Sequence, residues 1–156
     1  MKKVKLLYRL LVFINLLTFI LIGTQSIMLV IPDIYYSKVY ENHVLGAFNN
    51  LILTGLLVII LTGSFKVQQG IKHIIKEGFF NSTSELKFKH SGLIFIVFAC
   101  CRFLYIIIVI REFKLSELIN NSIMAFLVIL VGIGLLIFSD FIKNGGVLKE
   151  ENDLTI

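Results

Sequence analysis

The 156-residue chain has no tryptophan, a single proline (Pro32) and two cysteines, and only 16% of its residues are charged. One proline permits long uninterrupted helices, because proline in a helix interior removes a backbone donor and breaks the helix. The scarcity of charge excludes an ordinary soluble domain, in which about a quarter of the residues are charged. Hydrophobic residues instead make up 57% of the chain, and the mean hydropathy is +0.91. This composition predicts an integral membrane protein.

The sequence also lacks any pattern that would assemble a catalytic centre. It contains no glycine-rich phosphate loop, no HExxH motif and no nucleophile–base–acid spacing. Cys100 and Cys101 are adjacent in an apolar run, where neighbouring side chains on a helix point about 100° apart and cannot form a disulfide without distortion. His73 and His90 have no partner at metal-ligand spacing. We therefore predict a protein that is not an enzyme and needs no cofactor or metal.

Four runs of about 20 residues are long and apolar enough to cross a bilayer as helices. Three of them carry no charge, and the third in chain order contains Arg102. Two small residues in the last run, Gly132 and Gly134, are expected to let another helix approach closely. The short connections predict an all-α membrane protein, one integral membrane domain whose four transmembrane helices form an antiparallel bundle. The predicted spans are residues 10–31, 44–65, 91–110 and 118–139.

Lysine and arginine decide the predicted orientation. Four precede residue 10, five lie in the loop 66–90 and two in the tail 140–156, whereas the short loops 32–43 and 111–117 share three. Both termini and the loop 66–90 are therefore expected in the cytoplasm, with the chain in a bacterial inner membrane. The same bias accounts for the formal charge of +5, so direct nucleic-acid binding is not expected. The oligomeric state stays open.

The loop 66–90 has helical signals of its own. Apolar residues from Val67 to Ile75 recur at helical spacing, which predicts that the second span continues as an amphipathic helix. Gly78 is expected to end this helix. Ser82 and Glu85 have the spacing of a capping box and predict the start of the next helix. The loop is interpreted either as an ordered interfacial connector or as a surface that binds a protein or anionic lipid.

Arg102 is the one charge inside a predicted span, and counted from Ser91 it lies roughly 16 Å into the bilayer, near the midplane. Intramembrane charges are costly and usually face a bundle interior or a cavity. Uncharged polar residues of the other spans share its depth, so we predict an intramembrane polar cluster of Arg102, Gln25, Thr54 and Asn49. Three hypotheses stay open. The arginine holds helices together through these groups, meets an anionic lipid or small ligand in an outward-opening pocket, or snorkels to the outer surface.

The last polar stretch, GGVLKEENDLTI, begins at Gly145. Gly145 and Gly146 are expected to stop the fourth helix. The tail is then expected to fold back on the loop 66–90, with three acids, Glu150, Glu151 and Asp153, beside the loop's lysines. The residues predicted to bind a partner are Lys149, Glu150, Glu151, Asn152, Asp153, Leu154, Thr155, Lys72, Lys76, Lys87 and Lys89.

This tail resembles the C-terminal signature of the YoaS-like family of small bacterial membrane proteins, a domain of unknown function with four predicted spans. The resemblance rests on Gly146 and the run Leu148–Ile156, and the segment GFFNSTSELKFKHSG (Gly78–Gly92) is similar to the family's loop before its third span. It implies no activity and no catalytic residues. It does imply a partner, because family members are often encoded beside a small helix-turn-helix regulator.

The leading hypothesis is therefore a non-catalytic interaction or regulatory protein. It would bind a cytoplasmic partner, such as a helix-turn-helix transcription regulator, through the loop 66–90 and the tail. The alternative is a small-molecule or lipid binder, or an oligomeric transporter, with an outward polar pocket around Arg102. A purely structural or stress-related membrane protein is a third possibility.

Overall fold

A computed structural model describes the chain in three segments, residues 2–31, 43–109 and 115–154. Each of its four helices is long and apolar enough to cross a membrane. The predicted all-α architecture with four helices of membrane-spanning length is therefore confirmed, whereas most of the two predicted outer loops lies outside the described residues. The helices are α1 (Lys2–Val30), α3 (His43–Glu77), α4 (Ser82–Val109) and α5 (Leu115–Asp153).

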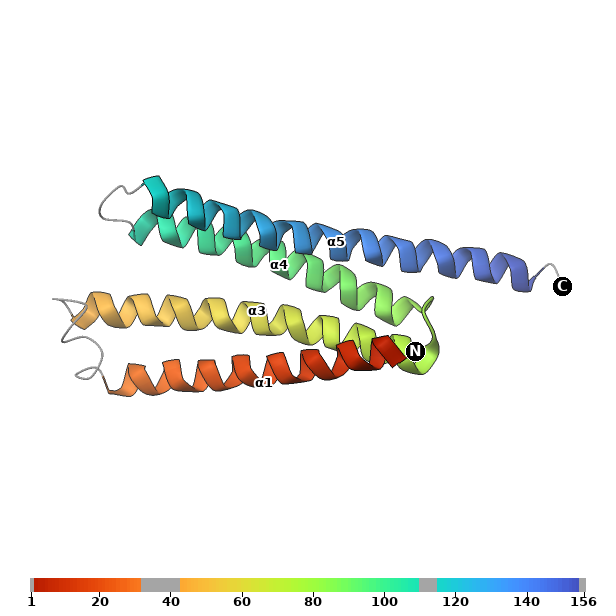
Figure 1. Ribbon diagram of the computed structural model, residues 1–156, viewed down its shortest axis with the longest axis horizontal. Coiled ribbons are helices and arrows are strands. Elements are labelled where there is room, and N and C mark those ends of the chain that lie inside the picture. Colours follow the sequence, from red (N-terminus) through yellow and green to blue (C-terminus); the bar gives the residue numbers. More distant parts are fainter. Residues whose placement is uncertain (1, 32–42, 110–114, 155–156) are drawn as a thin grey trace.

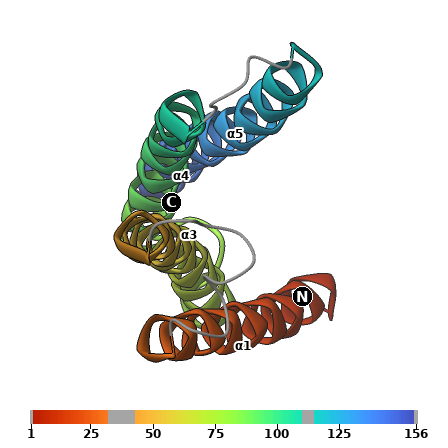
Figure 2. The ribbon, with the colours of Figure 1, turned by 90° about the vertical axis from the view of Figure 1, so that its left-hand side faces the viewer.

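Within the described residues, each helix packs only against its neighbours along the chain: α1 on α3, α3 on α4, and α4 on α5. Figure 1 shows the four helices lying side by side, and the end-on view in Figure 2 shows that they follow an open curve from α1 to α5. Because α1 and α5 do not touch, the arrangement is more open than a bundle in which the first and last helices close a ring.

The buried core lies at the end of the molecule where α3 turns into α4. Phe88 and Phe138 meet there edge to face, with ring centroids 4.9 Å apart, a favourable geometry for aromatic rings. All four helices contribute apolar side chains to this end. The core consists of Ile71, Ile74, Phe88 and Ile142, and the partly buried residues packed on it are Val4, Tyr8, Leu11, Val67, Ile75, Leu135 and Phe138.

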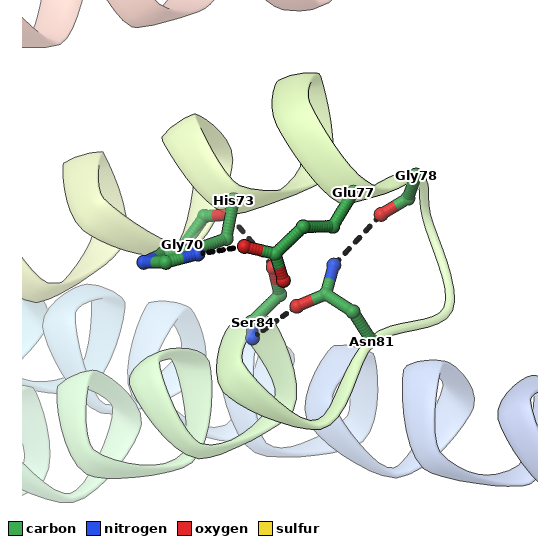
Figure 3. Close-up of polar contacts among 6 residues, drawn as sticks. All are labelled: Gly70, His73, Glu77, Gly78, Asn81 and Ser84. Atoms are coloured by element: carbon green, nitrogen blue, oxygen red, sulfur yellow. Dashed lines mark hydrogen bonds and ion pairs between the residues drawn. The ribbon is translucent and has the colours of Figure 1, made fainter.

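The turn between α3 and α4 is short and internally bonded. The predicted end of the preceding helix at Gly78 is confirmed, because α3 runs without a break to Glu77 and Gly78 has a φ of +93°, which favours glycine. The predicted cap at Ser82 is wrong by one residue. Asn81 caps α4 instead, since its Oδ1 accepts the backbone N–H of Ser84 at 2.7 Å while its Nδ2 donates to the Gly78 carbonyl at 2.7 Å (Figure 3).

Buried serines hold the inner helices together. The hydroxyls of Ser84 and Ser91 on α4 donate to carbonyl oxygens of two glycines in α3, over 2.9 and 2.8 Å. The hydroxyl of Ser139 on α5 donates to the Glu85 carbonyl of α4 over 3.0 Å. A hydroxyl can reach a carbonyl of the next helix only where the two backbones lie close, as small residues permit.

The backbones of α4 and α5 come into close approach at Gly92 and Gly132. A Cβ added to Gly92 would lie 2.7 Å from the Gly132 carbonyl oxygen, and a Cβ added to Gly132 would lie 2.9 Å from the Gly92 carbonyl oxygen. Real Cβ atoms are not found at such distances from a backbone atom. Around Gly134, by contrast, an added Cβ would meet nothing within 4 Å. The predicted packing role is thus confirmed for Gly132 and wrong for Gly134.

We expect Gly132→Ala to destabilise the fold by about 1–3 kcal/mol, because the new methyl group collides with backbone and forces α4 and α5 apart. Gly134→Ala is the matched control on the same helix, and its higher helix propensity should leave stability unchanged or raise it by up to about 1 kcal/mol. Thermal unfolding midpoints of both variants in the same detergent measure the difference. Equal midpoints would contradict the close approach of the two helices.

Candidate functional site

The C-terminal segment is a continuation of α5 and not a folded-back tail. The helix passes through Gly145 and Gly146 without interruption and ends at Asp153, so the predicted helix stop and the predicted fold-back are both wrong. Figure 1 shows this extension running beyond the turn between α3 and α4. Close packing explains the glycine at position 145 instead, because a Cβ there would overlap the ring of Phe80 from the turn. That ring also lies 6.0 Å from the ring of Phe141, between centroids.

A cavity of about 360 Å³ lies between the extension of α5 and the start of α4. One acid from each helix, Glu85 and Glu150, lines it, together with Lys143 and the exposed Val147. Further along the helix, Leu148 also exposes its apolar side chain. The residues that line the cavity are Phe80, Asn81, Ser82, Glu85, Ile142, Lys143, Gly146, Val147 and Glu150.

The predicted partner-binding residues fall into separate places. Glu150 lines the cavity beside α4, whereas Lys72 and Lys76 line a different cavity beside α1. Lys87 and Lys89 lie on α4. The exposed residues at the end of α5 and just after it are Lys149, Glu151, Asn152 and Leu154. Thr155 and the side chain of Asp153 lie outside the described residues. The structure therefore does not bring Glu150 together with Lys72 or Lys76, two of the four lysines that the fold-back prediction offered as neighbours of the acids.

The end of α3, the turn at residues 78–81 and the start of α4 form a helical hairpin that faces the α5 extension and is held together by hydrogen bonds. Figure 3 shows Asn81 bonded to both sides of the turn and the Ser84 hydroxyl bonded to the Gly70 carbonyl of α3. In the last turn of α3, His73 Nδ1 and Glu77 Oε1 lie 2.7 Å apart at i,i+4 spacing. These bonds give the cavity one fixed wall. No group of three or more metal-ligating side chains occurs in the described residues.

A second cavity, of about 400 Å³, surrounds Arg102. All four helices contribute to it, and its wall is mainly apolar. Arg102 is half-buried, and within the described segments no hydrogen bond or ion pair joins its guanidinium to another group. Its lining consists of Gln25, Leu53, Leu56, Leu57, Phe98, Arg102, Tyr105, Ile106 and Asn121.

Two of the predicted polar cluster residues share this cavity, and two do not. Gln25 lines it with Arg102, and the Gln25 Oε1 atom is buried with no hydrogen-bond partner in the described part of the chain. Asn49 accepts a hydrogen bond from the Tyr105 hydroxyl, which reaches it from the cavity wall. Thr54 donates to a carbonyl of its own helix over 2.8 Å. One hypothesis was that Arg102 holds the helices together through these groups (the clamp hypothesis), but its hydrogen bonds to Gln25 and Thr54 are not formed.

The predicted polar cluster leaves out three polar residues that lie in or near this cavity. Tyr105 and Asn121 line it, and Asn50 is fully buried and donates from Nδ2 to the Gln25 carbonyl over 3.3 Å, joining α3 to α1. The depth of Asn50 and Asn121 in their spans was visible from residue counts. The side of the helix on which each residue lies depends on the register between neighbouring helices, which counting residues does not reveal.

We expect Arg102→Leu to change the free energy of unfolding by no more than about 0.5 kcal/mol, because the guanidinium has no bond to lose. Ser91→Ala, on the same helix, should cost about 1 kcal/mol, since it removes the buried hydroxyl bond to the Gly63 carbonyl. Unfolding of both variants in one detergent gives the comparison. A greater loss for Arg102→Leu than for Ser91→Ala would revive the clamp hypothesis.

Comparisons of the chain with protein-family models, with curated proteins and with solved structures gave no match.

Proposed function

We propose that the chain is a multi-pass protein of the bacterial inner membrane that binds a cytoplasmic protein partner through the hairpin of α3 and α4 and the extension of α5. The observation that carries this proposal is the unbroken helical extension of α5, which passes a rigid turn and leaves a cavity beside it. The cavity and the exposed helix offer apolar groups and charges of both signs, a composition suited to a soluble protein partner and not to lipid chains alone.

The orientation belongs to the same proposal. Contacts between neighbouring helices occur in reverse order along the chain: Asn15 of α1 bonds to Gln68, late in α3, over 2.5 Å, whereas Gln25 contacts Asn50, early in α3. This order supports an antiparallel arrangement. The excess of lysine and arginine at one end supports cytoplasmic placement of both termini, the turn and the α5 extension.

A helix-turn-helix transcription regulator is the partner class we propose. The support comes from the resemblance of the run Leu148–Ile156 to the signature of the YoaS-like family, whose members are often encoded beside such regulators. Binding would hold the regulator at the membrane, without any catalytic step. The surface for it would be the helical extension, on which Val147 and Glu150, three residues apart, lie on one side that a helical partner can contact.

The detergent-solubilised full chain should retain the regulator encoded beside its gene in a pulldown, and the chain without residues 145–156 should not. The double variant Val147→Ser/Glu150→Gln removes two groups from the cavity wall and should lower recovery at least several-fold. Leu148→Ser/Glu151→Gln is the matched comparison, with the same two kinds of change one residue further on, and should lower recovery less, because these residues do not line the cavity.

Equal recovery with and without residues 145–156 would exclude the α5 extension from the interface. Failure of the full chain to retain the regulator would end the proposal of this partner class.

A second candidate function is favoured by the cavity around Arg102. A lone guanidinium in a mainly apolar wall suits an amphiphile with a carboxylate head, since arginine binds carboxylates with two parallel hydrogen bonds. The chain would then be a binder of a lipid-like anion, or one subunit of an oligomeric transporter.

For this candidate, a long-chain fatty acid should bind the purified chain about tenfold or more tightly than the alcohol of the same length, because only the acid makes charge-assisted bonds. Arg102→Leu should abolish the difference, whereas Thr54→Ala should keep it. Native mass spectrometry with both amphiphiles measures the ratio. Equal binding of acid and alcohol to the unchanged chain would rule out an anion site at Arg102.

A further inference from the structure

A third cavity, of about 310 Å³, lies between the start of α1 and the end of α3, and it is strongly basic. Four of its six lining residues are cations, two from each helix, and none is an acid. Its remaining two residues, Tyr8 and Ile75, also pack on the buried core. The cations are Lys5, Arg9, Lys72 and Lys76.

The spacing of these cations makes their gathering unfavourable without an anion. Lys5 and Arg9 are four residues apart on α1, and Lys72 and Lys76 are four residues apart on α3, so each pair lies on one side of its helix. Like charges at this spacing destabilise a helix, and here the two pairs also face one cavity. Repulsion therefore acts both along and between the helices.

The C-terminal end of α3 favours Lys76 in its last turn, but no ion pair relieves the repulsion in the described parts of the chain. None of the four cations has an ion pair there. The acid nearest in sequence, Glu77, is engaged by His73 over 2.7 Å. All four cations are exposed, so an anion from outside the protein can reach them.

The cavity lies where the apolar part of the helices ends. Arg9 directly precedes the uncharged run 10–31, and Lys72 follows the uncharged run 44–65 after about two turns of helix. In a bilayer this is the level of the lipid phosphates. Tyr8 adds the amphipathic ring that is typical of this level, and Ile75 adds apolar surface.

We propose that this cavity binds the phosphate of an anionic phospholipid headgroup, held by Lys5, Arg9, Lys72 and Lys76. Basic pockets between transmembrane helices are suited to such headgroups. Bound there, the lipid joins α1 to α3. This matters because α1 is the least buried helix, with 6% of its span buried against 17% to 22% for the other three. The site requires only that this end of the helices lies at a membrane surface, and it does not depend on a partner of α5.

The purified full chain should bind phosphatidylglycerol in preference to phosphatidylcholine with the same acyl chains, as seen by native mass spectrometry. Lys72→Gln/Lys76→Gln should weaken phosphatidylglycerol binding about tenfold, because two of four cations are lost. Lys87→Gln/Lys89→Gln is the matched control. It removes the same charge from α4, outside the cavity, and should bind the lipid as the unchanged chain does.

Equal losses in the two double variants would show general attraction to positive charge and overturn the proposal, as would equal binding of the two lipids.

Inorganic phosphate, tested without lipid and as a competitor of the lipid, separates a lipid headgroup from free phosphate as the ligand. If phosphate does not bind at millimolar concentration, the result supports a lipid site. If phosphate saturates the chain and displaces the lipid, the lipid site is overturned. If the Lys72→Gln/Lys76→Gln variant fails to fold, Lys5→Gln/Arg9→Gln takes its place, because it removes the other two cations of the cavity and should weaken phosphatidylglycerol binding to a similar degree. The Lys72→Gln/Lys76→Gln variant should still recover the regulator in the pulldown. Loss of lipid binding can therefore be told apart from loss of the interface on the α5 extension.

Discussion

The close approach of α4 to its two neighbours is the contact on which the rest of the structure depends. At Gly92 and Gly132 the backbones of α4 and α5 leave no room for a side chain, and the buried hydroxyls of Ser84 and Ser91 join α4 to α3. In lipid there is no water to drive apolar faces together, so association of helices depends on dense packing and on hydrogen bonds of this kind. The small residues of α4 therefore determine where α3 and α5 can lie, and among the described residues α1 packs on α3 alone.

Because each helix packs on the helices next to it in the sequence, the two ends of the molecule are packed differently. Near the turn, Phe88, Ile142 and side chains of the other helices fill the interior. Toward the level of Arg102, the interior instead contains a cavity lined by all four helices. Because α1 and α5 do not close the arc, the hydrophobic cluster holds the helices together at one end, and hydrogen bonds join them toward the other: Asn50 donates to the Gln25 carbonyl, and Tyr105 donates to Asn49. The three proposed binding sites lie where this packing ends: at the α5 extension, at the basic cavity beside α1 and around Arg102.

The sequence was sufficient for features that depend on one helix alone. Run length predicts the four helices, and apolar spacing predicts that α3 continues past its span to Gly78. It was insufficient for features that depend on contacts between two helices. Gly145 reads as a helix stop, because glycine is common there, but its actual role is to let α5 pass Phe80. Ser82 and Glu85 match a capping box, yet Asn81 is one residue earlier and can bond across the turn as well. The cavities depend on helix register, so only part of the polar cluster could be predicted from depth.

The charges that form no ion pair among the described residues connect these observations. A cation loses hydration when it is placed against apolar groups, and an arrangement that gathers cations persists only if other interactions compensate. At Arg102 the compensation can come from one anionic group in a mainly apolar cavity, because a single guanidinium offers several donors. Beside α1, four cations at the level of the lipid phosphates call for an anion that is already part of the membrane. In this protein, then, the loosely attached first helix and the concentration of positive charge have one explanation: α1 is held to α3 partly by the protein and partly by the lipid that surrounds it.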